Sequence, residues 1–496
     1  MITRRIQIKA MSSRLFSNQD LAALFFPLVI EQTLKYSLGL ADSMMIASVG
    51  EAAISGVSLI DFVLSFITSL FAALLVGGSA VISQYIGARE TVQANKAANQ
   101  LVLIVGLFSL FLCVAVYAAK SFILNYLFGQ LAPDVYAHAE IYLTITASSL
   151  PFLALYSAGA NLFRCMDNTR LPMKIMTVCN LLNIAGNAIL IFGMGMETVG
   201  VALPTLFSRI VAAGWILGLL LNKKRKLYLF RQLRLSFDWL IIRRILGIGI
   251  PHGIENGMFF LGRILVLGMI ASLGTAAIAS NAVAGILSNF QVIPGMAVAF
   301  GTTVVIARCA GADDYEQVKY YNRKILGIVY VSQFVTSMTV LMLLPQIMRI
   351  YGLPAETIRL TEQIMWIHTL FMIVLWPLSY ILPATFRATG DARYPMAVSI
   401  IGLFAGRIFS SWLFGIHWQM GVLGVWLGMF ADWIIKSACF IVRYYSGKWI
   451  RSDLWVSDKK LKFSMLGKRE KFWLSVIISQ NIFCNRGTFV RKTGTH

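Results

Sequence analysis

The segment MIASVGEAAI at residues 45–54 returns almost unchanged as MIASLGTAAI at residues 269–278. The first copy begins at Met45 and the second at Met269, and the chain on either side of them matches at the same offset. A second pair of segments continues the repeat, with RCMDNTRLPM at 164–173 resembling RATGDARYPM at 387–396. The sequence therefore predicts a duplicated protein, in which each half folds in the same way.

The composition places both halves in a membrane. Of the 496 residues, 58% are apolar and 13% are charged, against roughly 25% charged residues in soluble domains. The apolar residues form long runs, such as 101–119 and 325–344, and a membrane-spanning helix needs about 20 such residues. We therefore predict an all-α membrane protein and exclude a soluble enzyme or a disordered chain.

Twelve membrane-spanning helices fit the apolar runs, six in each copy of the repeat. Six spans are an even number, so both copies insert with the same orientation and are related by an axis along the membrane normal. The predicted fold is therefore two pseudo-symmetric lobes of six helices. The spans are expected near 21–48, 53–82, 98–119, 138–162, 172–192, 199–221, 241–272, 276–306, 325–345, 362–386, 395–415 and 421–445.

The basic residues indicate the orientation. The chain has 43 Lys and Arg against 22 Asp and Glu, a net charge of +21. Of the 43, 35 fall in the N-terminus, the C-terminal tail and the loops on one side of the predicted membrane. Three fall on the other side, and the remaining five lie inside the spans. Because cytoplasmic loops collect Lys and Arg, we expect both termini in the cytoplasm and the protein in the cell membrane.

The domain organisation follows from these spans. We expect a basic cytoplasmic N-terminus, an N-lobe, a basic cytoplasmic linker at the midpoint, a C-lobe and a basic C-terminal tail. In the tail, the apolar run at 472–484 is too short to span a membrane; it is either an interfacial segment or an extension without function. The five regions are 1–20, 21–221, 222–240, 241–446 and 447–496.

Two lobes around a central axis are typical of secondary transporters. The chain has no GxxxxGK[ST] sequence for ATP, so an ion gradient must supply the work. It also has no HExxH, GxSxG, CxxC or Cys/His pair, so we expect no enzyme activity, no cofactor and no tightly bound metal. The expected partners are small organic cations and membrane lipid, with no nucleic acid, and we expect a monomer.

The first span carries Glu31, Lys35 and Asp42. At 100° per residue the three lie within about 40° of one another, over about 16 Å of helix. Pro27 lies one turn before Glu31, where it removes a backbone donor and can bend the helix. Ionisable groups inside a membrane are typically functional, so we predict that Asp42 or Glu31 takes up H⁺ or a transient Na⁺. A static Glu31–Lys35 ion pair is the alternative.

The seventh span repeats part of this arrangement. Pro251 and Glu255 match Pro27 and Glu31, whereas Asp42 is matched by the apolar Val266. Arg263 follows Glu255 by eight residues. Glu255 is therefore either a second coupling carboxylate or part of a structural Glu255–Arg263 pair.

Other polar residues extend the candidate site. Asn180, Asn183 and Asn187 form one stripe of the fifth span, where they either complete a cation site or hold helices together. Asp61, in the second span, lies either in the central cavity or at its outer mouth. Asp432 and Lys436 in the twelfth span are separated by one helical turn, which favours a structural ion pair.

The chain resembles the multidrug and toxic compound extrusion (MATE) family. The resemblance is carried by ADSMMIASVGEAAISGVSL at 41–59, GGSAVISQYIGA at 77–88, RCMDNTRLPM at 164–173 and their counterparts in the second half, and it covers about residues 20–446. It implies two lobes in a V shape. It also implies a polyspecific efflux antiporter that exchanges cationic, amphipathic compounds for Na⁺ or H⁺.

The resemblance also implies roles for particular residues. Asp42 takes the position of a coupling carboxylate, Pro27 that of the proline where the helix bends, and the fifth-span asparagines that of the polar residues completing the site. Members with a coupling glutamate in the seventh helix carry it at the position of Phe259, and Glu255, one turn earlier on nearly the same face, either substitutes for it or does not. The tenth-helix aspartate of those members has no counterpart between Trp366 and Phe386.

Two rival classes of transporter are considered. The first is a flippase for a lipid-linked sugar, which needs a strongly cationic cavity for a pyrophosphate group. The second is a major-facilitator carrier, whose GxxxDRxGR loop is replaced here by SQYIGARE at 83–90. The flippase remains the alternative to the antiporter.

Overall fold

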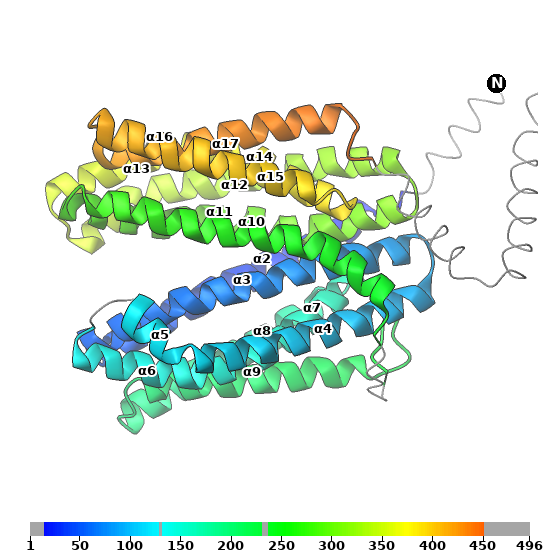
Figure 1. The fold of residues 1–496 in the computed structure, drawn as a ribbon, viewed down its shortest axis with the longest axis horizontal. Coiled ribbons are helices and arrows are strands. Elements are labelled where there is room, and N and C mark those ends of the chain that lie inside the picture. Colours follow the sequence, from blue (N-terminus) through cyan, green and yellow to red (C-terminus); the bar gives the residue numbers. More distant parts are fainter. Residues whose placement is uncertain (1–13, 128–130, 231–236, 451–496) are drawn as a thin grey trace, which may run out of the picture. The chain divides into compact units, whose positions relative to one another are not determined.

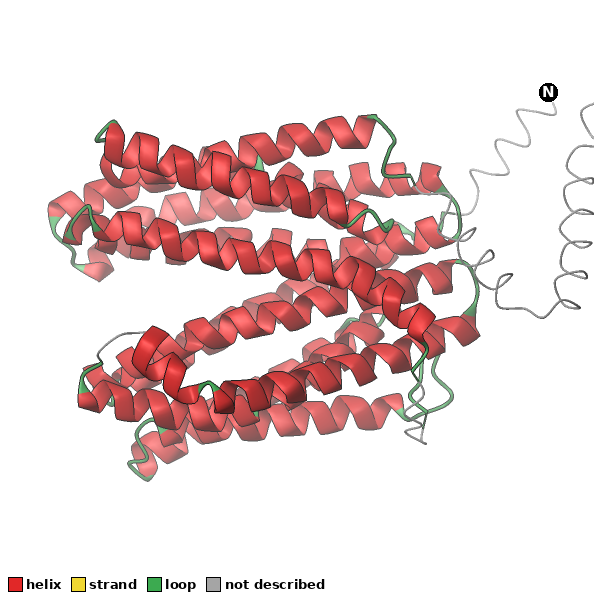
Figure 2. Ribbon diagram, viewed as in Figure 1, coloured by secondary structure: helices red, strands yellow, loops and turns green. Residues whose placement is uncertain are grey.

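The computed structural model describes residues 14–127, 131–230 and 237–450. All regular elements within these residues are helical, as Figure 2 shows. The apolar run predicted at 472–484 lies outside the described residues.

Two bundles of helices follow one another along the chain (Figure 1). The first bundle consists of α2 (Asn18–Ala47), α3 (Glu51–Gly87), α4 (Thr91–Ala118), α5 (Lys120–Phe122), η1 (Ile123–Leu127), α6 (Pro133–Ser148), α7 (Leu150–Cys165), α8 (Arg170–Ala188), η2 (Ile189–Gly193) and α9 (Val199–Leu220). The second bundle consists of α10 (Trp239–Ala271), α11 (Thr275–Gly311), α12 (Tyr315–Tyr351), α13 (Ala355–Val374), α14 (Trp376–Ala388), α15 (Arg393–Ile401), η3 (Gly402–Ile408), α16 (Phe409–Ser411), η4 (Trp412–His417) and α17 (Gly421–Tyr445).

The predicted number of spans agrees with the structure when bent helices are counted as single spans. Ten described helices are long and apolar enough to cross a membrane. Two further spans are helix pairs, α6 with α7 and α13 with α14, bent by 44° and 40°. Pro151 and Pro377 lie in the first turn after each break, and a proline there cannot donate the hydrogen bond that would continue the helix.

The ends of several helices are set by local chemistry. Ser17 begins α2 with a capping box, because its hydroxyl accepts from the Asp20 amide while the Asp20 carboxylate accepts from the Ser17 amide. The side chain of Asp314 caps α12 in a similar way. At the other end of α12, Gly352 has φ of 58°, which suits a glycine because it lacks a Cβ.

The two bundles meet at one end and diverge toward the other in the view of Figure 1. We call the end where they meet the basic end, because α2 begins there and α3 and α4 are joined there by one of the basic loops. The other end is the opposite end. Contacts between the bundles are made chiefly by α3 with α10 and α11, and by α2 with α11. The second and eighth spans thus form the centre of the protein.

At the basic end, α3 and α11 cross closely at two equivalent glycines. A Cβ on Gly87 would lie 2.0 Å from the backbone oxygen of Arg308, and a Cβ on Gly311 would lie 2.0 Å from the backbone oxygen of Gln84. The two glycines match at the offset of the repeat. Small residues let helices approach to backbone contact, so the repeat has placed one such residue on each side of a pseudo-two-fold axis.

Candidate functional site

The carboxylate of Asp42, on α2, contacts the asparagine stripe of α8. Asn187 Nδ2 donates to Asp42 Oδ1 at 2.6 Å. The amide of Asn183 also lies against Asp42, within 3.0 Å of Oδ1 in the orientation that lets it accept from Thr205. Both asparagine side chains are almost completely buried. The predicted stripe therefore faces α2 and surrounds its carboxylate with amides.

Asn180, the third member of the stripe, makes a different contact. Its Nδ2 donates to the backbone oxygen of Leu34 at 3.0 Å. This bond holds α8 against the backbone of α2 and leaves the side chain without a contact to Asp42. The stripe was expected either to complete a cation site or to hold helices together. Asn180 holds helices together, whereas Asn187 and Asn183 contact the Asp42 carboxylate.

More polar groups of the first bundle gather near Asp42. Asp61 is exposed on α3 and accepts from the Tyr142 hydroxyl at 3.0 Å. Arg209, on α9, donates to Ser149 Oγ at 2.5 Å, and its charge acts on both Asp42 and Asp61. We call Asp42, Asp61, Tyr142, Asn187 and Arg209 the mid-span cluster. Its members lie within the predicted spans, and most of them are in the half of each span that is nearer the opposite end. Tyr142 and Arg209 could not be assigned to this cluster from the sequence, because their partners lie on other helices.

Two further cations lie in the middle of the spans. Lys35 is exposed on α2, about two turns from Asp42, and its charge interacts with that of Arg209. Arg263 is exposed on α10 and lies within electrostatic range of Tyr36 on α2. Because α10 and α2 belong to different bundles, Arg263 brings a charge of the second bundle close to the mid-span residues of the first.

Glu31 lies outside the mid-span cluster, in an ion pair that the sequence did not predict. Its carboxylate is bonded by the guanidinium of Arg164, at the end of α7. Glu31 is only 4% exposed, whereas Lys35 is exposed. The alternative of a Glu31–Lys35 pair is therefore wrong, because packing of the bundle supplies a buried partner that is distant in sequence.

Glu255 has an equivalent partner in the second bundle. Arg387 Nη1 lies 2.9 Å from Glu255 Oε2, and His252 Nδ1 lies 3.2 Å from the same oxygen. Ser399 Oγ donates to the other oxygen at 2.7 Å. The alternative of a Glu255–Arg263 pair is therefore wrong as well.

A signal for both pairs was present in the repeat. Arg164 and Arg387 are the first residues of RCMDNTRLPM and RATGDARYPM, the segments that match between the halves. Glu31 and Glu255 also match at the repeat offset. A glutamate and an arginine repeated together in both halves are candidates for one duplicated ion pair.

The second bundle also contains buried charges. Lys436 Nζ lies 3.0 Å from the Asp432 carboxylate, as the spacing predicts, and Arg407 Nη2 lies 3.3 Å from it. The guanidinium of Arg407 also stands over the ring of Phe259, 5.3 Å from its centroid. This part of the second bundle therefore contains an aromatic ring beside a cation. Among the described residues, no group of three His, Cys, Asp or Glu side chains could hold a metal ion.

Comparison with known proteins decides the family. The MatE family model matches the chain twice, at residues 27–189 and at residues 251–413. The two ranges are separated by the same offset as the two copies of the repeat. The chain belongs to the MATE family. The predicted resemblance and the duplication are therefore confirmed, and because the family consists of transporters, so is the prediction that the chain is not an enzyme.

MATE relatives align along nearly the whole described part of the chain. The probable multidrug resistance protein NorM of Thermotoga maritima is 26% identical over 438 residues, 87% of this chain and 93% of that protein. The uncharacterized transporter YisQ of Bacillus subtilis is 24% identical over 442 residues, covering 88% and 96%. A solved MOP superfamily transporter from Pyrococcus furiosus, described by a reverse polarity of its binding pocket, superposes with a TM-score of 0.81 at 19% identity, covering 87% and 96%. The predicted MATE fold is confirmed.

In this MATE transporter, two equivalent hydrogen bonds join the bundles at the basic end. Gln84 Nε2, on α3, donates to the backbone oxygen of Ala388 at 2.8 Å. Arg308 Nη2, on α11, donates to the backbone oxygen of Cys165 at 2.6 Å. Both acceptors are carbonyls at the C-terminal end of a helix, which lack an intrahelical partner. Gln84 and Arg308 match at the offset of the repeat.

Side-chain pairs add to these bonds. Arg308 Nη1 lies 2.7 Å from Asp167 Oδ2, and Arg244 Nη1 donates to the Tyr85 hydroxyl at 2.8 Å. We call the glycine crossing, the two carbonyl bonds and these pairs the basic-end seam. The seam holds the two bundles together at the basic end, between that end and the mid-span cluster.

Proposed function

We propose that this MATE transporter is a secondary active antiporter, which exports cationic or amphipathic small molecules in exchange for H⁺ or Na⁺. The observation that carries the proposal is the Asp42 carboxylate in the last two turns of α2, bonded by Asn187. A carboxylate inside a membrane span is costly, so its presence there indicates a function. The oxygen atom of the Asn187 amide is buried and has no hydrogen-bond partner. An unpaired acceptor beside a carboxylate is suited to a protonated acid or a sodium ion.

In the proposed cycle, the bundles separate at the opposite end when the basic-end seam is closed. When the seam opens, they come together at the opposite end. We propose that the basic end faces the cytoplasm, since it collects the Lys and Arg residues. Pro27 and Pro251 are buried in α2 and α10, and we propose that these helices bend there as the bundles rock. The bound ion and the substrate must favour different states, because a ligand with equal affinity for both shifts nothing.

Electrostatics suggest how the ion and the substrate affect one another. Ionised Asp42 attracts Arg209 of the first bundle and any cationic substrate between the bundles. Binding of H⁺ or Na⁺ removes this negative charge, so the substrate loses its attraction and leaves. The two cargoes would thus compete for one carboxylate, which couples their movement.

The test is efflux of a fluorescent organic cation from proteoliposomes under an imposed pH or sodium gradient. We expect gradient-driven transport by the wild type and none by Asp42→Asn. Glu51→Gln is a matched control, because Glu51 is an exposed acid in the first turn of α3 at the opposite end; it should transport like the wild type. Transport without a gradient, or full activity of Asp42→Asn, would contradict the proposal.

A second candidate function is export of an anionic lipid-linked sugar. The observation that favours it is the excess of cations at mid-span depth, where Lys35, Arg209 and Arg263 outnumber Asp42 and Asp61. Guanidinium groups bind phosphate well. The same proteoliposomes distinguish the two candidates: an amphiphile with a pyrophosphate head should neither inhibit cation efflux nor be translocated if the antiporter proposal holds. Translocation of that amphiphile, lost in Arg209→Gln, would establish the second candidate.

A further inference from the structure

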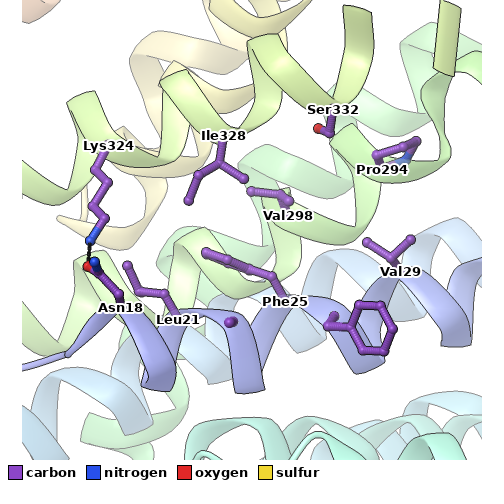
Figure 3. Close-up of a pocket in the computed structure, with 11 residues that line it drawn as sticks. Asn18, Leu21, Phe25, Val29, Pro294, Val298, Lys324, Ile328 and Ser332 are labelled. Carbon is purple, nitrogen blue, oxygen red and sulfur yellow. Dashed lines mark hydrogen bonds between the residues drawn. The ribbon is translucent and has the colours of Figure 1, made fainter. Parts of the chain in front are cut away.

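An apolar groove lies between the two bundles, far from the mid-span cluster. It has a volume of about 340 Å³ and is lined by α2 of the first bundle and by α11 and α12 of the second. Figure 3 shows Phe25 and Val29 of α2 facing Val298 and Ile328 across it. Phe26, also in the lining, is 68% exposed, so the groove opens outward at the membrane-facing side of α2.

The length of the groove fits one leaflet of a bilayer. Its lining runs along α2 from Asn18 to Val29 and along α12 from Lys324 to Ser332. At 1.5 Å per residue these stretches are about 16 Å and about 12 Å long. Half of the hydrocarbon core of a membrane is about 15 Å thick. The groove therefore extends from the basic end to about the bilayer centre, which is the depth of a single acyl chain.

The basic-end mouth of the groove carries positive charge. The ammonium of Lys324 is bonded to the Asn18 side chain, as Figure 3 shows. Lys324 and Arg14 both stand over the ring of Tyr320, at 5.8 Å and 4.5 Å from its centroid. Asp20, the acid in the first turn of α2, accepts from the Ser17 amide at 2.8 Å and is not part of the groove's lining. Basic pockets between membrane helices bind anionic lipid head groups.

We propose that this groove binds one anionic phospholipid from the leaflet at the basic end. One acyl chain lies between Phe25 and Val298, and the phosphate is bound by Lys324 and Arg14. Because this acyl chain touches helices of both bundles, the bound lipid stabilises the state in which the basic-end seam is closed. This assignment is independent of which ion or substrate the transporter uses.

The test is native mass spectrometry of the purified protein with phosphatidylglycerol and, separately, with phosphatidylcholine. The wild type should retain one phosphatidylglycerol and little phosphatidylcholine. Lys324→Gln should retain about fivefold less, which is the usual effect of one basic residue near an anionic lipid surface. Lys319→Gln is the matched control, because Lys319 is a lysine of the same helix that is paired with Glu316 outside the groove.

A second pair of variants tests the acyl-chain part of the site. Ala22→Phe fills the groove from α2, and Val331→Phe adds the same ring to an exposed position of α12 outside the lining. Phosphatidylglycerol should raise the melting temperature of the wild type and of Val331→Phe but not of Ala22→Phe. Equal retention of both lipids, equal retention by the two lysine variants, or displacement of the lipid by a transported cation would overturn the proposal.

Discussion

Adding one methyl group at the glycine crossing should shift the protein away from the state with the closed seam. In Gly87→Ala, the new Cβ would lie 2.0 Å from the Arg308 backbone oxygen, and real Cβ contacts essentially never fall below 3.0 Å. The helices must therefore separate by about 1 Å. The nearest atoms all belong to the other bundle, so packing within the first bundle is unaffected. Gly311→Ala should behave in the same way, because it meets the Gln84 backbone at the same distance.

The size of the effect follows from the cost of overpacking, which is about 1–3 kcal/mol. Applied to the closed state alone, this cost raises the population of the open state about 5- to 150-fold. Gly253→Ala is the control. It lies on α10 at the same interface, and its Cβ would make an ordinary contact of 3.6 Å with Ala73. Gly253 lies inside α10, whereas Gly87 and Gly311 are the last residues of α3 and α11. The gain in helix propensity, at most about 1 kcal/mol, is therefore largest in the control, and the clash is specific to the two crossing variants.

Hydrogen-exchange mass spectrometry measures the shift, since exchange of protected amides follows the population of open states. Peptides covering residues 79–95 and 303–319 should exchange faster in Gly87→Ala and Gly311→Ala than in Gly253→Ala. Peptides covering the loops at the opposite end, near residues 48 and 272, should become more protected as the bundles close there. If the two crossing variants exchange like the control, the glycine crossing does not hold the seam closed.

Two further predictions concern the buried polar groups. Asn187→Ala removes a hydrogen bond to a charged group, which contributes about 1.5–3 kcal/mol, so the ion concentration for half-maximal transport should change by about tenfold or more; an unchanged ion titration would remove Asn187 from the coupling site. Glu31→Ala leaves Arg164 buried without its acid, which should lower the free energy of unfolding by about 3–5 kcal/mol. Adding Arg164→Ala should restore most of that loss in detergent unfolding measurements, whereas additive losses would show that the two side chains act separately.

The membrane-spanning helices were predictable because their signals are local. Each span is an apolar run of sufficient length, and the helices in the structure extend beyond several of the expected boundaries, by up to ten residues at the start of α12. The two bends at Pro151 and Pro377 did not change the number of spans. The repeat also predicted that both halves share a fold, since similar sequences pack in similar ways.

The candidate site was predictable only where one helix determines it. The asparagine stripe of α8 could be predicted from the helical period, and two of its members do contact Asp42. The partners of Glu31 and Glu255 were predicted wrongly, because the expected partners were cations on the same helix. Arg164 is 133 residues away from Glu31, and nothing in the spacing along one helix indicates such a contact.

Hydrophobicity and helical periodicity act along the chain, so they are enough to establish twelve spans, two related halves and an acid on the first helix. Ion pairs, the glycine crossing and the apolar groove depend on distances between helices that are remote in sequence. Electrostatic energy varies with those distances and with burial, and close packing is decided atom by atom. Which cation meets which acid, and where the two bundles touch, therefore emerged only once the helices were packed together.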